Sequence, residues 1–164
     1  MHWIESAGGP LVLVPERSLD LWMGADGPDG RETHYERACS VEDFVGLVPL
    51  DGGPAIVLGD EPLRTAWRPS GTGGMLVRWI AAPGEDDIES ALATLPEGLP
   101  WENVLDFDHP GGALLLFDAA LPGEELPDDH LSVELPAGRW TLGLSAYHPS
   151  DEVALLLHRL VRAS

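Results

Sequence analysis

The sequence predicts a mainly β, β-rich α+β fold built of antiparallel sheets, with one or two short helices. The first reason is the distribution of Gly and Pro: 19 Gly and 15 Pro are spread over all 164 residues and divide the chain into short segments. The second is a set of short apolar runs, and the third is a pair of similar blocks. Short apolar segments between turns favour strands over the long helices of a bundle.

Three segments begin with a Gly-Gly pair and continue as an apolar run. They read GGPLVLV at 8–14, GGPAIVL at 52–58 and GGALLLF at 111–117. Such a run is typical of a strand buried on both faces, although periodicity alone also admits a buried helical turn.

Two longer blocks, 52–95 and 111–161, resemble each other. Each reads as a strand, an acidic loop, a strand or hairpin with an Arg-Trp pair, an acidic turn and a terminal element. We interpret them as a degenerate duplication within one domain, 1–164, with pseudo-repeat halves of roughly 1–100 and 101–164. Trp79 and Trp140 follow Arg at equivalent points, so we expect them in matching places.

The remaining segments fit between these blocks. Residues 24–37 and 121–130 are polar and rich in turn residues, which predicts two long loops. Residues 86–95 begin with acids and continue with apolar residues at helical spacing, which predicts a short helix. The second block ends in 153–161, which fits either a helix or a final strand.

Acidic residues dominate the charge, and most of the excess lies in the second half. The net charge is −19, and residues 79–138 contain fourteen Asp or Glu and no Lys or Arg. The negative electrostatic field of so many acids keeps a protein soluble, speeds its encounter with a basic partner and repels nucleic acid. A generically acidic surface would have the same composition.

Composition also argues against several classes of protein. Cys39 is the only cysteine, which excludes an internal disulfide, and we expect it to be a small buried side chain. No run reaches the length of a membrane span, and the first residues do not read as a secretory signal, so we expect a cytoplasmic protein.

Candidate catalytic and metal-binding residues are sparse. The acidic segments ending in His109 and His130 could hold a cation, but neither supplies four ligands, and the histidines lack the spacing of a zinc helix. No nucleophile motif or phosphate loop is present. We therefore expect no enzyme activity, no metal and no cofactor.

Six tryptophans are a high number for this length. Most are expected in the core, where Trp anchors a small sheet. Trp22 and Trp67 lie beside polar loops, so an alternative places them at a partner interface.

Several motifs resemble the immunity protein twenty-one family of bacterial polymorphic toxin systems. They are WIESAGGPLVLVPE at 3–16, YERAC at 35–39 and AIVLGDEP at 55–62, followed by Thr65, Trp67 and Arg78-Trp79. The second half is less distinctive. The resemblance implies a strand-rich cytoplasmic protein that neutralises a cognate toxin by binding it, without catalysis or cofactor.

Charge adds a hypothesis about the interface. Toxins of such systems are often nucleases or deaminases with basic clefts, which an acidic inhibitor would reach quickly. We expect the partner to contact loop acids within 83–134, with a Trp as apolar anchor. The candidate residues are Glu85, Asp86, Asp87, Glu124, Glu125, Asp128, Asp129, Trp67 and Trp101.

Three alternatives stay open. The 24–37 loop, with Tyr35 and Arg37, could be the interface instead. The protein could be an acidic sensor or adaptor that binds a small ligand or a basic protein. A hydrolase built on carboxylates is the third.

Overall fold

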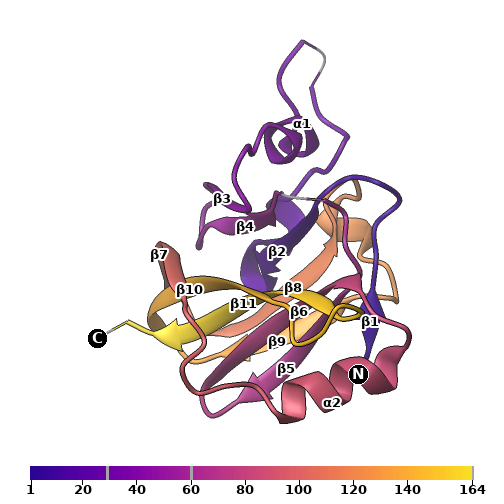
Figure 1. The fold of residues 1–164 in the computed structure, drawn as a ribbon. Coiled ribbons are helices and arrows are strands. Elements are labelled where there is room, and N and C mark those ends of the chain that lie inside the picture. The colour runs from indigo at the N-terminus through magenta and orange to yellow at the C-terminus, as the bar shows by residue number, and fades with distance from the viewer. Residues whose placement is uncertain (29, 60, 164) are drawn as a thin grey trace.

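The computed structural model describes residues 1–28, 30–59 and 61–163 (Figure 1). Asp29 of the 24–37 loop, Asp60 of the AIVLGDEP motif and Ser164 lie outside the described residues. Strands make up most of the regular structure, which confirms the predicted fold class. In chain order the elements are β1 (Trp3–Ile4), β2 (Leu11–Pro15), the 3₁₀ helix η1 (Glu16–Leu21), α1 (His34–Cys39), β3 (Val45–Val48), β4 (Ala55–Leu58), β5 (Thr65–Ser70), β6 (Gly73–Ala81), α2 (Glu85–Ala93), β7 (Glu102–His109), β8 (Gly112–Asp118), the 3₁₀ helix η2 (Gly123–Glu125), β9 (Leu131–Leu135), β10 (Gly138–Tyr147) and β11 (Ala154–Arg162).

Two antiparallel sheets pack face to face. The first, sheet A, has six strands in the order β1-β5-β6-β11-β10-β7, and the second, sheet B, has five in the order β3-β4-β2-β8-β9. Both sheets therefore combine strands from the two halves of the chain. The main core lies between them, and its buried side chains include Leu13, Leu76, Leu116, Trp140 and Leu160. In β9 only alternate residues are buried, as expected for a strand with one face on a core and one in solvent.

The three Gly-Gly segments supply the three middle strands of sheet B. β4, β2 and β8 lie side by side, and each is buried almost throughout. Their inner faces point into the main core, and their outer faces pack under a second apolar cluster that includes Trp22 of the segment after η1 and Ala38 of α1. Burial on both faces explains why these runs contain no polar alternation.

The outer face of sheet A is covered by α2 (Figure 1). Ile88, Ala91 and Leu92 form its buried side and belong to one cluster with Val77 and Leu157 of the sheet. The predicted helix is confirmed, with bounds 85–93 instead of 86–95. In the second block the equivalent element, β11, is a strand at the centre of sheet A.

The two Arg-Trp pairs are not in matching places. Trp140 is fully buried between the sheets, whereas Trp79 is partly exposed on the outer face of sheet A and packs against Trp3. Successive residues of a strand point to opposite faces, so a register difference of one residue exchanges the two members of a pair. Accordingly, Arg78 is buried and Arg139 is exposed.

Two local expectations from the first half were wrong. Residues 34–37 belong to α1, because the Thr33 hydroxyl accepts a hydrogen bond from the Glu36 amide at 3.0 Å and starts a helix inside the expected loop. Cys39 is exposed, because it ends this helix on the solvent side while Ala38 faces the cluster over sheet B.

His158 on β11 is a buried titratable group whose effect on stability has a defined sign. It is fully buried, and neither ring nitrogen has a hydrogen-bond partner among the described residues. Desolvation, and then the nearby Arg78 charge, lower the pKa of His158 to about 3. The folded protein therefore keeps a neutral imidazole, while the unfolded chain binds a proton below about pH 6.5.

We therefore expect His158 to make the protein less stable as the pH falls below 6.5. Between pH 6.5 and 5 this single group should remove about 2 kcal/mol of the free energy of unfolding. Urea unfolding at several pH values would measure it, with His158→Leu as the control. Identical pH slopes for the wild type and the variant would show that His158 is not the cause.

Candidate functional site

Acidic side chains gather where the first turn of α2 meets the start of the chain. The Met1 amino group lies 2.8 Å from Glu85 Oε1 and 3.7 Å from Glu89 Oε1. The next residue, His2, contacts Asp129 through Nε2 and Oδ1 at 2.6 Å. Because adjacent Cα atoms are only about 3.8 Å apart, residues 1–2 bring two distant acidic segments to one side of the molecule. We call Glu85, Asp86, Asp87, Asp128 and Asp129 the acidic rim.

The members of the acidic rim differ in how far they are neutralised. The hydrogen bond from the Met1 ammonium group lowers the pKa of Glu85, and the same bond raises the pKa of the ammonium group. Asp86, Asp87 and Asp128 are exposed. Glu85, Asp86 and Asp87 all lie in the first turn of α2, at the positive end of the helix dipole, where acidic side chains stabilise a helix. Asp86, Asp87 and Asp128 are therefore exposed carboxylates that remain open to solvent.

The other predicted contact residues lie in three further places. Glu124 and Glu125 are exposed on η2, which packs against η1. Trp67 on β5 is partly buried against the main core. Trp101 precedes β7 on the outer face of sheet A, beyond the other end of α2. A helix of nine residues is about 14 Å long, so Trp101 and the acidic rim are distinct parts of the surface.

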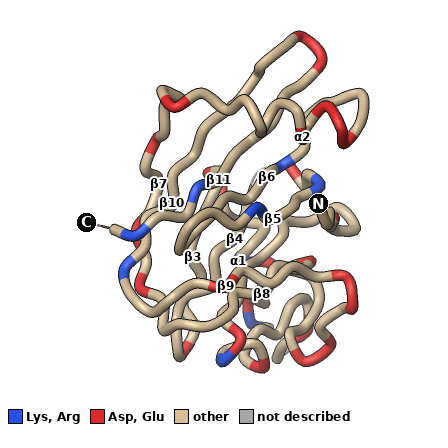
Figure 2. The backbone as a smooth tube through the Cα atoms, turned by 90° about the horizontal axis from the view of Figure 1, so that it is seen from below, with Lys and Arg blue, Asp and Glu red and all other residues tan. Residues whose placement is uncertain are grey.

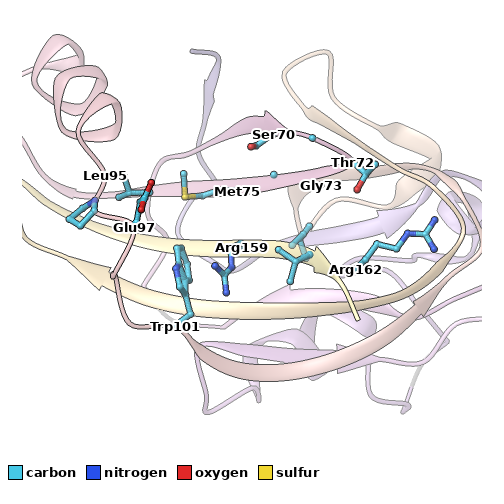
Figure 3. A pocket seen from close by; sticks show the side chains of 14 residues that line it. Ser70, Thr72, Gly73, Met75, Leu95, Glu97, Trp101, Arg159 and Arg162 are labelled. Atoms are coloured by element: carbon cyan, nitrogen blue, oxygen red, sulfur yellow. The ribbon is translucent and has the colours of Figure 1, made fainter. Parts of the chain in front are cut away.

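Trp101 lines a groove with a volume of about 540 Å³ (Figure 3). Its floor comes from β6 and β11, and its walls come from the β5–β6 turn and the segment after α2. Figure 3 shows Arg159 beside Trp101, with Arg162 and Thr72 towards the other end. The Arg159 guanidinium carbon lies 4.3 Å from the centre of a Trp101 ring.

A second cleft, of about 400 Å³, lies between the edge strands β3 and β7. Three large apolar side chains of these edges are exposed by about two fifths to one half: Phe44 (49%), Leu47 (41%) and Val104 (37%). Glu42, Asp43 and Glu102 are exposed around them. This side of the sandwich is an alternative contact surface.

In the two segments considered for cation binding, which end in His109 and His130, the fold directs the histidines and the neighbouring acids to different partners. His109 is buried and bonds Gly112 O at 2.9 Å, while Asp106 and Asp108 lie on the opposite face beside Arg139. His130 contacts Pro127 O, and its neighbour Asp129 contacts His2. Among the described residues, no three His, Cys, Asp or Glu side chains form a metal-binding group.

The sequence predicted the positions of the aromatic residues only in part. Trp22, considered for an interface, is fully buried; its Nε1 donates to Ala119 O at 3.0 Å and its ring stacks on His34. The sequence also did not single out Arg159 or His2 as site residues. Alternation in β11 was the available signal for Arg159, because it places this Arg on the face away from Leu160.

Figure 2 shows acidic residues along loops and turns around the backbone, with few basic residues between them. No helix in the described part of the chain is long and apolar enough to cross a membrane. Fold and composition together define a small acidic protein of two packed antiparallel sheets. The chain belongs to the immunity protein 21 family, which it matches over residues 2–153.

This match confirms the resemblance seen in the sequence motifs and extends it through most of the second half. The chain therefore has the role of an immunity protein at the level that its family defines. No curated protein and no solved structure matches the chain closely enough to add a relative.

Proposed function

We propose that this protein binds a cognate bacterial toxin domain one to one and blocks it, with the acidic rim facing a basic cleft of the toxin. Family membership supports the toxin partner. The acidic rim is supported as the binding surface by one observation: the 85–87 and 128–129 segments both contact residues 1–2. A toxin that cuts or deaminates nucleic acid needs a basic cleft, and such a cleft would be complementary to the acidic rim. The toxin we propose is therefore a nuclease or a deaminase.

The proposed mechanism is occupation of the cleft. Exposed carboxylates at Asp86, Asp87 and Asp128 would take the places of substrate phosphates, and their field would speed the encounter. No covalent step and no cofactor enter this mechanism. The protein acts by binding in the cytoplasm, before the toxin reaches its substrate.

Growth rescue tests this function. The C-terminal domain of the protein encoded immediately upstream is expressed in a bacterial host, with and without this chain. We expect arrest without the chain, growth with it, and a co-purifying one-to-one complex. A harmless neighbour, or a host that dies despite equal expression of the chain, would contradict the proposal.

A further inference from the structure

Arg159 is a partly buried cation without a charged partner among the described residues. Its Nε is buried and has no hydrogen-bond partner there, and its guanidinium group stacks on Trp101. This is unusual in a chain with 28 acidic and 9 basic residues, where an Arg meets a carboxylate easily. The terminal N–H groups of this guanidinium therefore keep hydrogen-bonding capacity that an anionic ligand in the groove can use.

Stacking on Trp101 leaves the terminal N–H groups of this guanidinium available to the groove, whereas Nε itself is buried. Stacking on an aromatic ring uses the face of the group, whereas its five N–H donors lie in the plane. The neighbour of Arg159 on β10 is Gly143, which has no side chain to cover it. Trp101 thus holds the group in one orientation, and the planar edge fits two oxygens of one ligand.

The rest of the groove restricts the ligand. Met75, Leu95 and Trp101 give it apolar surface beside the cation, and Glu97 is exposed on its rim. Arg162 lies towards the other end of the groove, over the Trp140 ring, so Arg159 is the cation beside the apolar surface. A dianionic phosphate there would be repelled by Glu97 and by a net charge of −19 more strongly than a monoanion. A ligand with an apolar body and a single carboxylate fits both the apolar surface of the groove and the Arg159 cation.

We propose that the Trp101–Arg159 groove is a binding site for an organic monocarboxylate with an apolar or aromatic body. The carboxylate accepts hydrogen bonds from the terminal N–H groups of Arg159, and the apolar body lies against Trp101 and Met75. This site is separate from the acidic rim and does not depend on it. The ligand is either a free small carboxylate or the carboxylate of a protein chain.

The test compares N-acetylphenylalanine with its uncharged amide in NMR titrations of the full chain at constant ionic strength. The Arg159 Nε–H and Trp101 indole signals report on the site directly. We expect saturable shifts with the carboxylate, at a dissociation constant on the order of 1–10 mM, and about tenfold or weaker binding of the amide. Equal binding of the two compounds, or no shift of either signal, would overturn the proposal.

Two variants make the assignment specific. Arg159→Gln should weaken the carboxylate about ten- to hundredfold, because one charge-assisted contact is lost. Arg139→Gln removes an equal charge from sheet A, where Arg139 lies beside Asp106 and Asp108, and should leave binding unchanged. Retained binding in Arg159→Gln, with its backbone spectrum preserved, would assign the shifts to another site.

A final comparison identifies the source of the carboxylate. If it belongs to the toxin, Arg159→Gln weakens the complex with the toxin and N-acetylphenylalanine competes with complex formation. If it is a free ligand, Arg159→Gln leaves the affinity for the toxin unchanged but weakens binding of the small carboxylate. A negative growth-rescue result would leave the NMR titration valid, because the titration needs no toxin.

Discussion

Trp140→Ala should lower the free energy of unfolding by about 3–5 kcal/mol, because it opens a large cavity between the two sheets. The side chain is fully buried in the main core, and its Nε1 donates to Pro136 O at 3.0 Å. The substitution removes both the packing and this donor. A loss of that size corresponds to a melting temperature lower by roughly 10 °C for a domain of this length.

Trp79→Ala is the matched control, since it removes the same side chain from the other Arg-Trp pair. Trp79 is only partly buried, against Trp3 and beneath Arg64. We expect a cost of about 2 kcal/mol, mostly from lost apolar burial. Thermal and urea unfolding of both variants would measure the difference. Equal costs would mean that the two tryptophans occupy equivalent places after all.

The middle of sheet B could be predicted because its strands depend on local pattern alone. A Gly-Gly turn followed by an unbroken apolar run indicates a strand with two covered faces, and β2, β4 and β8 are such strands. The helix α2 was predictable for the same reason, from acids at its start and the spacing of Ile88 and Leu92.

Register and long-range contacts could not be predicted in this way. Whether Arg or Trp of a pair points into the core depends on strand pairing, which differs by one residue between β6 and β10. One acidic segment was predicted as the start of a helix and the other as a separate loop, and only tertiary structure brings Glu85 and Asp129 to neighbouring residues of the chain. The groove around Arg159 likewise depends on the meeting of β6, β11 and the segment after α2.

The second large effect concerns the rate of toxin binding. The triple variant Asp86→Asn, Asp87→Asn, Asp128→Asn removes three exposed charges from the acidic rim without changing side-chain size. We expect the association rate constant at low salt to fall about tenfold or more, because electrostatic steering weakens. The dependence of this rate on ionic strength should also become shallower. The free energy of unfolding should fall by only about 1 kcal/mol, because Asp86 and Asp87 are exposed and lose only their interaction with the α2 dipole.

The matched control removes three charges from the β3–β7 side instead: Glu42→Gln, Asp43→Asn and Glu102→Gln. The overall charge of the two variants is the same, so a general effect of net charge would slow both equally. A loss confined to the control would place the toxin on the apolar edges around Phe44.

The most direct measurement is therefore the stopped-flow association rate of the wild type and both triple variants with the purified toxin domain, over a range of salt concentrations. We expect a rate about tenfold lower for the acidic-rim variant alone at low salt, with the rates of the three proteins converging at high salt. An acidic-rim variant that associates as fast as the wild type at every salt concentration would contradict this expectation.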